Sequence, residues 1–188
     1  MFEPDYAVLA YIRDGRFSAV TAVLAVLHAR GSVVAGKAGT VRRSDTEAAP
    51  PEGFERDVWT AIHGFVSPGA LMARPTVDAS LNDLRRRARQ LGLLRAFLPV
   101  RGFLPARTAL GRRMVDAATE ACCWPPSPDA NEIPVEEWVE MAVARYGNEA
   151  LKVLMPTFAR DSGLLDRVDT DGADWADPEA PGPVGRYV

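Results

Sequence analysis

The chain has few of the side chains that enzymes use most often in catalysis. Its 188 residues include only two histidines, His28 and His63, and only two cysteines, at the adjacent positions 122 and 123. Each histidine falls in a predicted helix, where a packed or solvated ring is more common than a general base. Neighbouring cysteines cannot join distant parts of a chain and lack the spacing of a zinc site. We therefore expect two reduced thiols, no metal and no cofactor.

The sequence also lacks the motifs of common nucleotide enzymes and hydrolases, and it lacks long apolar runs. No GxSxG, Walker A or dinucleotide-binding motif occurs. No run approaches the roughly 20 apolar residues that a membrane span requires, and the N-terminus does not have the pattern of a signal peptide. Hydrophobic residues still make up 47% of the chain, which is enough for a core. These features predict a soluble, cytoplasmic protein that is not an enzyme and does not enter a membrane.

Charge is distributed unevenly along the chain, although the net charge is only −3. Ten arginines and two aspartates give residues 74–113 a balance of +8, whereas seven acidic residues and three arginines give residues 160–188 a balance of −4. Only two of the 22 basic residues are lysines, a usage typical of a high-GC bacterial genome. The molecule is therefore electrically polarised, with a basic middle and an acidic end.

The N-terminal part has the element order of a winged-helix unit. Apolar residues at three- and four-residue intervals predict a helix over residues 17–30, which Gly31 ends. The β-prone segments 32–35 and 40–43 flank a glycine-containing turn and predict a hairpin. With a preceding helix over residues 4–13, the order is helix, turn, helix and wing.

A degenerate repeat of this order follows. Residues 54–64 and 76–92 are predicted helices, and the apolar residues 93–104 are interpreted as a strand or wing of the second unit, or as a docking segment. We therefore predict a mainly α protein with small β wings and tandem winged-helix-like units, followed by a helical segment and an acidic tail. The predicted parts are a first unit at 1–47, a second unit at 53–106, a C-terminal helical segment at 107–165 and an extended or disordered tail at 166–188.

The C-terminal segment is predicted to contain helices over residues 108–121, 134–147 and 148–160. Pro156 predicts a kink in the last of these helices. In the middle helix, the three glutamates are expected on the outer or N-terminal side. They are Glu136, Glu137 and Glu140.

The predicted wing is a candidate peptide-binding edge. An extended peptide can add to an exposed strand edge through main-chain hydrogen bonds. The alternative is an ordinary wing packed over its own helix. The candidate residues are Ser32, Val33, Val34, Thr40, Val41, Arg42 and Arg43.

A second candidate surface is a basic patch that could bind phosphates or an acidic peptide. The alternative is the solvated back of a helix, because three consecutive arginines at 85–87 point around most of a helix and make no single face. The patch residues are Arg85, Arg86, Arg89, Arg112 and Arg113.

Five blocks of the sequence resemble, in order, a high-GC bacterial family of unassigned activity. The blocks are DYAVLAYIRDGRFSAVTAVLAVLHARGSVV, ERDVWTAI, LRRRARQLGLL, RTALGRRMVDA and MAVARYGNEALKVLMPTFARDSGL, within residues 5–165. In that family a duplicated winged-helix-like region is usually followed by membrane helices, which this chain lacks. The relatives resemble neighbours of multinuclear iron-dependent oxidases that modify ribosomally made peptides.

The resemblance implies a non-catalytic partner protein that binds the leader of a precursor peptide and docks it to such an iron-dependent enzyme. It transfers no catalytic residues. The alternative is a winged-helix DNA-binding transcriptional regulator, with nucleic acid as a less favoured partner. That alternative is weakened by the acidic pI and by the apolar helix at 17–30, which offers few side chains to base edges.

Overall fold

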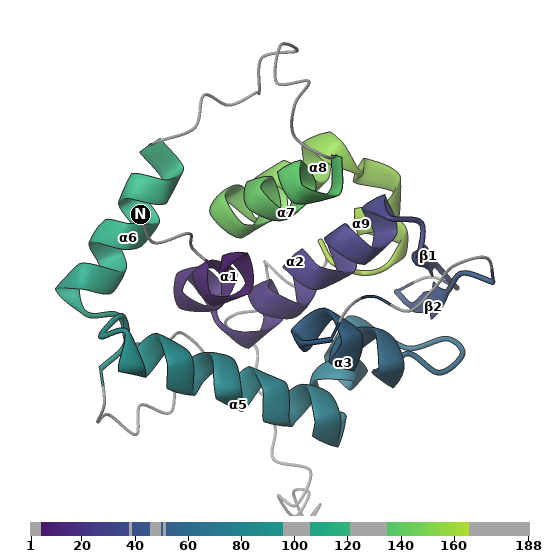
Figure 1. The fold of residues 1–188 in the computed structure, drawn as a ribbon. Helices are drawn as coiled ribbons and strands as arrows, with labels where there is room; N and C mark the ends of the chain where they lie inside the picture. The colour runs from purple at the N-terminus through teal and green to yellow at the C-terminus, as the bar shows by residue number, and fades with distance from the viewer. Residues whose placement is uncertain are drawn as a thin grey trace, which may run out of the picture.

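Helix α2 (Arg16–Ala29) lies at the centre of the fold (Figure 1). The computed structural model describes residues 5–37, 39–45, 50, 52–95, 106–120 and 135–165. Ten consecutive α2 residues, 18–27, are buried. Alanine, valine and leucine occupy almost the whole circumference of α2, and a helix that is apolar all round is stable only when other elements cover it.

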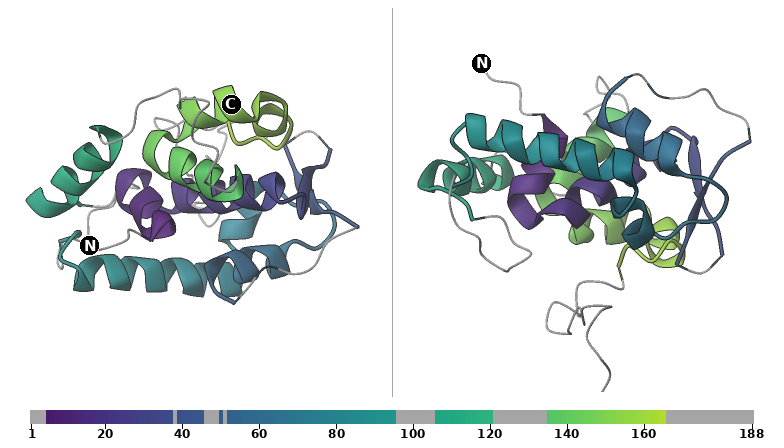
Figure 2. Two further views of the ribbon diagram at one scale, coloured as in Figure 1. Left: turned by 45° about the horizontal axis from the view of Figure 1, so that its top comes forward. Right: turned by 90° about the horizontal axis from the view of Figure 1, so that it is seen from below.

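The helices around α2 form three layers, seen edge-on in the left view of Figure 2. The middle layer is α2 with α1 (Tyr6–Asp14), joined through Gly15, whose φ of 82° allows a sharp turn. One outer layer contains α7 (Val135–Tyr146), which packs against both central helices. The other outer layer contains α3 (Phe54–Ala61), α4 (Pro68–Met72) and α5 (Pro75–Gln90).

Three further helices complete the described structure. Helix α6 (Ala109–Glu120) contacts α1 and α7. Gly111 allows α6 to approach the backbone closely, because a Cβ at this position would lie 2.2 Å from the carbonyl oxygen of Leu93. Helices α8 (Asn148–Leu154) and α9 (Pro156–Asp161) follow α7, and α9 contacts strand β1.

The hairpin consists of β1 (Val33–Ala35) and β2 (Val41–Arg43), which pair antiparallel with Val34 opposite Arg42. It is the only sheet within the described ranges. Val33 and Val41 are fully buried, so one face of the hairpin packs on the core. The turn contains Gly39 with a φ of 77°, a conformation that glycine adopts without strain.

The predicted mainly α fold with a small β wing is confirmed, and the order helix, helix, hairpin at the N-terminus is confirmed as well. The tandem winged-helix arrangement is not confirmed. After α5 the described residues contain a single antiparallel bridge, Leu94 to Arg107, in place of a second hairpin. Most of the predicted second wing, the predicted acidic tail and the two cysteines lie outside the described residues.

Two local predictions were wrong. Helix α3 ends at Ala61, so His63 lies beyond it in an exposed loop. Pro156 starts a new helix after Met155, whose φ of −145° and ψ of 58° interrupt the helix completely.

One hydrophobic core extends through all of these elements. Buried residues from α1, α2, α5, α7 and α9 belong to a single cluster. The predicted boundaries near residues 50 and 107 remain predictions, but the described core crosses both of them. None of the described helices has the length and apolar character to cross a membrane.

Candidate functional site

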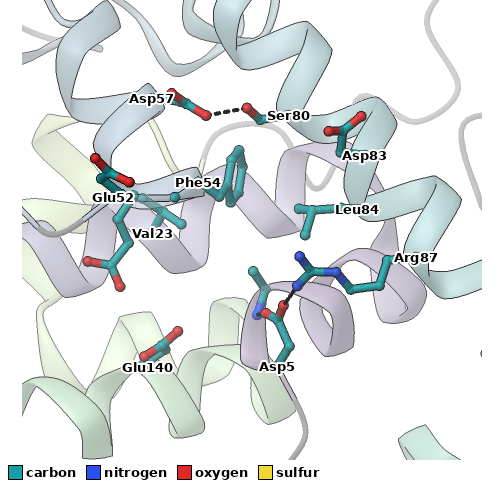
Figure 3. Close-up of a pocket in the computed structure, with 13 residues that line it drawn as sticks. Asp5, Val23, Glu52, Phe54, Asp57, Ser80, Asp83, Leu84, Arg87 and Glu140 are labelled. Carbon is teal, nitrogen blue, oxygen red and sulfur yellow. Dashed lines mark hydrogen bonds and ion pairs between the residues drawn. The ribbon is translucent and has the colours of Figure 1, made fainter.

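A pocket of about 460 Å³ opens between α1, α3, α5 and α7 (Figure 3). Its apolar floor comes from four elements of the core, through Ala7, Val23, Phe54 and Leu84. The volume lies in the range of sites that bind small ligands or single side chains.

Six carboxylates surround this apolar floor, while Arg87 is the only basic residue among the described residues of the lining. Three of the six carboxylates have arginine partners: Asp5 binds Arg87, Glu55 binds Arg30 and Asp83 binds Arg86. The other three have no arginine or lysine partner among the described residues. They are Glu52, Asp57 and Glu140.

Two of the lining carboxylates also have structural roles. Asp5 caps the N-terminus of α1, where its Oδ1 atom accepts the backbone N–H groups of Ala7 at 3.1 Å and Val8 at 3.4 Å. Asp57 accepts a hydrogen bond from the hydroxyl of Ser80, which joins α3 to α5. Both interactions hold the walls of the pocket in place, and the second is drawn in Figure 3.

Glu140 is the most perturbed of these carboxyl groups. Burial and the negative charge of Glu55 raise its pKa to about 7, and the charges of Asp5 and Glu137 act in the same direction. The positive charge of Arg30 opposes the shift. Near pH 7 Glu140 is therefore divided between its neutral and ionised forms, and a cation in the pocket would favour the ionised form.

The chemistry of the pocket suits a positively charged group attached to an apolar stem. Lysine and arginine side chains have this form, because their methylene stems bury while their charged ends stay near polar groups. Within the described ranges, no three His, Cys, Asp or Glu side chains are grouped closely enough to hold a metal ion. The pocket therefore has the character of a recognition site for an organic cation.

This pocket was not predicted from the sequence. Glu140 was expected on the outer or N-terminal side of its helix, but it lines the pocket. The sequence contained one usable signal, the close spacing of Glu52, Glu55 and Asp57 around the start of α3. The other carboxylates come from distant parts of the chain, and only the packing of four helices brings them together.

On the predicted peptide-binding edge, the outer side of β2 already has partners. The backbone of Val41 exchanges two hydrogen bonds with Val66, at 2.8 and 3.0 Å. The Arg43 guanidinium donates to the carbonyl oxygens of Trp59, at 2.8 Å, and Thr60, and it stacks over the Trp59 ring at 4.0 Å. An added strand on this side would have to displace these contacts.

The other predicted residues of the wing are distributed between the core and the surface. Ser32 is buried and Val34 is partly buried. The Thr40 hydroxyl donates to the carbonyl oxygen of Lys37 at 2.6 Å, and Arg42 forms an ion pair with Asp45 at 3.6 Å. No observation tests whether a peptide binds here, so the predicted edge remains a prediction.

The predicted basic patch is divided by the fold. Arg86 is exposed and paired with Asp83, while Arg112 and Arg113 are exposed on α6. Arg85 and Arg89 lie four residues apart on one face of α5, and neither has an acidic partner among the described residues. The five arginines therefore do not form one uniform face.

His28 has a structural role. Its ring stacks on Phe158 of α9 with the ring centroids 3.8 Å apart, and its Nδ1 atom donates to the carbonyl oxygen of Val33 at 2.9 Å. These contacts attach the hairpin and α9 to the end of α2. His63 is exposed, so the two histidines do not form a shared site.

Comparisons with protein-family models, with curated proteins and with solved structures found no match. The fold and the pocket therefore have to be interpreted from their own geometry and chemistry.

Proposed function

We propose that this chain is a cytoplasmic, non-catalytic recognition protein with a winged-helix-like scaffold. It binds a precursor peptide and presents that peptide to a multinuclear iron-dependent oxidase. The acidic pocket at Glu140 is the observation that carries the proposal. A basic side chain of the peptide would enter the pocket, and a neighbouring apolar residue would cover Phe54 and Leu84.

The pocket supports recognition in preference to catalysis for a physical reason. Its ionisable groups are almost all carboxylates, and half of them are occupied by arginines or by a helix cap. A binding site needs charge complementarity and an apolar surface, and both are present here. The predicted wing remains a second candidate surface for the same peptide.

The alternative function, a DNA-binding regulator, has less support. Winged-helix readers of sequence place a helix in the major groove. The helix before the hairpin is α2, and its residues 18–27 are buried beneath other helices, so its side chains are unavailable to base edges.

The proposal is tested with the purified full chain and with the peptide and oxidase encoded by neighbouring genes. Co-expression is expected to yield a complex of the chain with both partners. Fluorescence anisotropy of the labelled precursor then measures peptide affinity. If the neighbouring genes encode neither a short peptide nor an iron-dependent oxidase, or if neither partner binds, the proposed function is wrong.

The pocket is tested with two substitutions. Glu140→Gln combined with Glu52→Gln should weaken peptide binding at least tenfold, because both side chains keep their size but lose their negative charge. Glu120→Gln combined with Asp116→Asn, which removes two exposed carboxylates on α6 outside the pocket, is the matched control and should leave the affinity unchanged. Equal losses in the two proteins would show that net charge, and not the pocket, determines binding.

A further inference from the structure

Helix α5 has two polar sides with different chemistry. Ser80, Asp83 and Arg87 face the acidic pocket, whereas Val77, Leu81 and Leu84 belong to the buried face. A third stripe contains residues 78, 82, 85 and 89, which are spaced at four, three and four residues and therefore share one face of the helix. This stripe begins with an aspartate and ends with two arginines.

The first part of the stripe is bound to other groups. Asp78 forms an ion pair with Arg16 at the start of α2, and it also accepts a hydrogen bond from the side-chain amide of Asn82 at 3.0 Å. Arg16 is thereby held against α5. Its positive charge then lies on the same side of the helix as Arg85 and Arg89.

Tyr11 of α1 lies beside this cluster. Its exposed fraction is only 6%. Burial raises the pKa of Tyr11, while the charges of Arg85, Arg16 and Arg89 oppose that rise, so the phenol lies within electrostatic range of all three guanidinium groups. The Nε atom of Arg89 is buried and has no hydrogen-bond partner among the residues that the structure describes.

A buried guanidinium N–H without a partner is unusual, because such a group costs free energy unless a hydrogen bond satisfies it. All of the hydrogen-bond donors in this cluster are suited to the same kind of ligand, an anion. Guanidinium groups bind carboxylates in a planar, two-pronged geometry, and a phenol can donate a further hydrogen bond to the same anion.

We propose that Tyr11, Arg16, Arg85 and Arg89 form a binding site for the carboxylate group of an acidic peptide side chain. The site is separate from the acidic pocket and lies on the opposite side of α5. It does not depend on the proposed function, since the carboxylate can belong to any acidic protein segment. A carboxylate is favoured over the phosphates of nucleic acid because Asp78 and Asp83 interrupt the basic surface of α5, whereas DNA requires several phosphate contacts.

The test uses the full chain with ¹⁵N-labelled arginine side chains. The probe is a capped peptide of four glutamates, and inorganic phosphate and a random-sequence DNA duplex are the comparison ligands. The glutamate peptide is expected to shift the Nε–H resonances of Arg85 and Arg89. Phosphate and DNA should bind at least fivefold more weakly at the same ionic strength. Equal or tighter binding of either ligand would contradict the assignment to a carboxylate.

Three variants locate the site. Tyr11→Phe removes only the hydroxyl and should weaken peptide binding about tenfold, which corresponds to one charge-assisted hydrogen bond. Arg85→Gln with Arg89→Gln should abolish binding. Arg74→Gln removes an exposed arginine at the other end of α5 and should change nothing. The proposal is wrong if Tyr11→Phe, checked for folding by circular dichroism, binds the peptide as the parent does, or if Arg74→Gln weakens binding equally.

Discussion

Thr21 is a polar residue inside the most apolar helix of the protein. Its exposed fraction is 2%, and its hydroxyl has no hydrogen-bond partner within the described structure. Ser162 shows the usual arrangement, since it is fully buried but its hydroxyl donates to the carbonyl oxygen of Phe158 at 2.6 Å. The two residues therefore have opposite energetic roles, although both are buried hydroxyls.

Replacing Thr21 should stabilise the protein. Thr21→Val keeps the branched shape and removes the unsatisfied hydroxyl, so the free energy of unfolding should rise by about 1 kcal/mol. Urea denaturation measures this change. Ser162→Ala is the comparison and should lower stability by about 1 kcal/mol, because it removes a satisfied hydroxyl. Loss of stability in Thr21→Val would mean that the hydroxyl is satisfied in solution.

Glu140 makes stability depend on pH. Its pKa is about 7 in the folded protein, above its ordinary value of 4.5, so the folded state binds the proton more tightly than the unfolded state does. The contribution of this group is fully present below pH 4.5 and is lost as the pH rises through 7. Glu140→Gln has no proton to lose, and it should become progressively more stable than the parent between pH 5 and pH 8.

Urea denaturation at pH 5, 6, 7 and 8 checks this expectation, with Glu120→Gln as a control that should follow the parent at every pH. The same titration has a consequence for binding. A cationic ligand prefers the ionised carboxylate, so its affinity should increase between pH 6 and pH 8 in the parent and change less in Glu140→Gln. A constant difference in stability at all four pH values would contradict the perturbed pKa.

At the scale of the elements, one arginine connects α1 to the C-terminus of α7. The Arg13 guanidinium donates to the carbonyl oxygens of Val143 and Ala144, each at 2.9 Å, and to the Ser18 hydroxyl at 2.6 Å. These carbonyls are in the last turn of α7, where the helix dipole favours a positive charge. Gly147 leaves the necessary space, because a Cβ there would lie 2.3 Å from the guanidinium.

Removing the Arg13 side chain should destabilise the C-terminal end of α7. Arg13→Ala is expected to cost about 2–4 kcal/mol, because the charge-assisted hydrogen bonds to the two carbonyl oxygens and to the Ser18 hydroxyl are lost. Arg13→Lys should lose part of that amount, since an ammonium group lacks the planar arrangement of donors. Chemical denaturation gives the energies, and faster amide exchange confined to the α7–α8 region would locate them. Arg74→Ala is the control, with an expected change within about 0.5 kcal/mol.

At the scale of the whole molecule, α2 connects the N-terminal and C-terminal parts of the chain. It packs against α1 and β1 from its own predicted unit, against α3 and α4 from the second, and against α7 from the C-terminal segment. Three of these five elements, α3, α4 and α7, therefore lie outside residues 1–47. Without them, a large apolar surface of this helix would face water.

The isolated fragment 1–47 is consequently expected not to fold. Circular dichroism and the dispersion of its amide proton resonances should be those of an unfolded or aggregated peptide. A chain of residues 1–165, which contains every residue that the structure describes, is the control and should show a cooperative thermal transition. A folded, monomeric 1–47 fragment would instead support an independent winged-helix domain.

Much of the fold follows from local patterns in the sequence. The helices at α1, α2, α5, α6 and α7 were predicted within a few residues, because each has an apolar stripe and a glycine or proline near its end. The hairpin followed from its β-prone segments and its glycine-containing turn. These signals act between neighbouring residues, so they can be read without knowledge of the tertiary structure.

The candidate sites could be predicted only in part from such local patterns. Arg85 and Arg89 were identified from the sequence, but Tyr11 and Arg16 were not, because their proximity requires α1 and α2 to pack against α5. Glu140 was assigned to the wrong side of α7 for the same reason. The helical period shows which residues share one face of a helix, but it does not show which other element packs against that face.

The sequence alone thus determined that the chain forms amphipathic or apolar helices with one small ribbon, since hydrophobic periodicity and backbone conformation are local properties. Only the tertiary structure decided which charges became neighbours. It placed unpaired carboxylates on one side of α5 and unpaired arginines on the other, and the pKa and the partner of an ionisable group depend on everything within a few ångströms, whatever its distance along the chain.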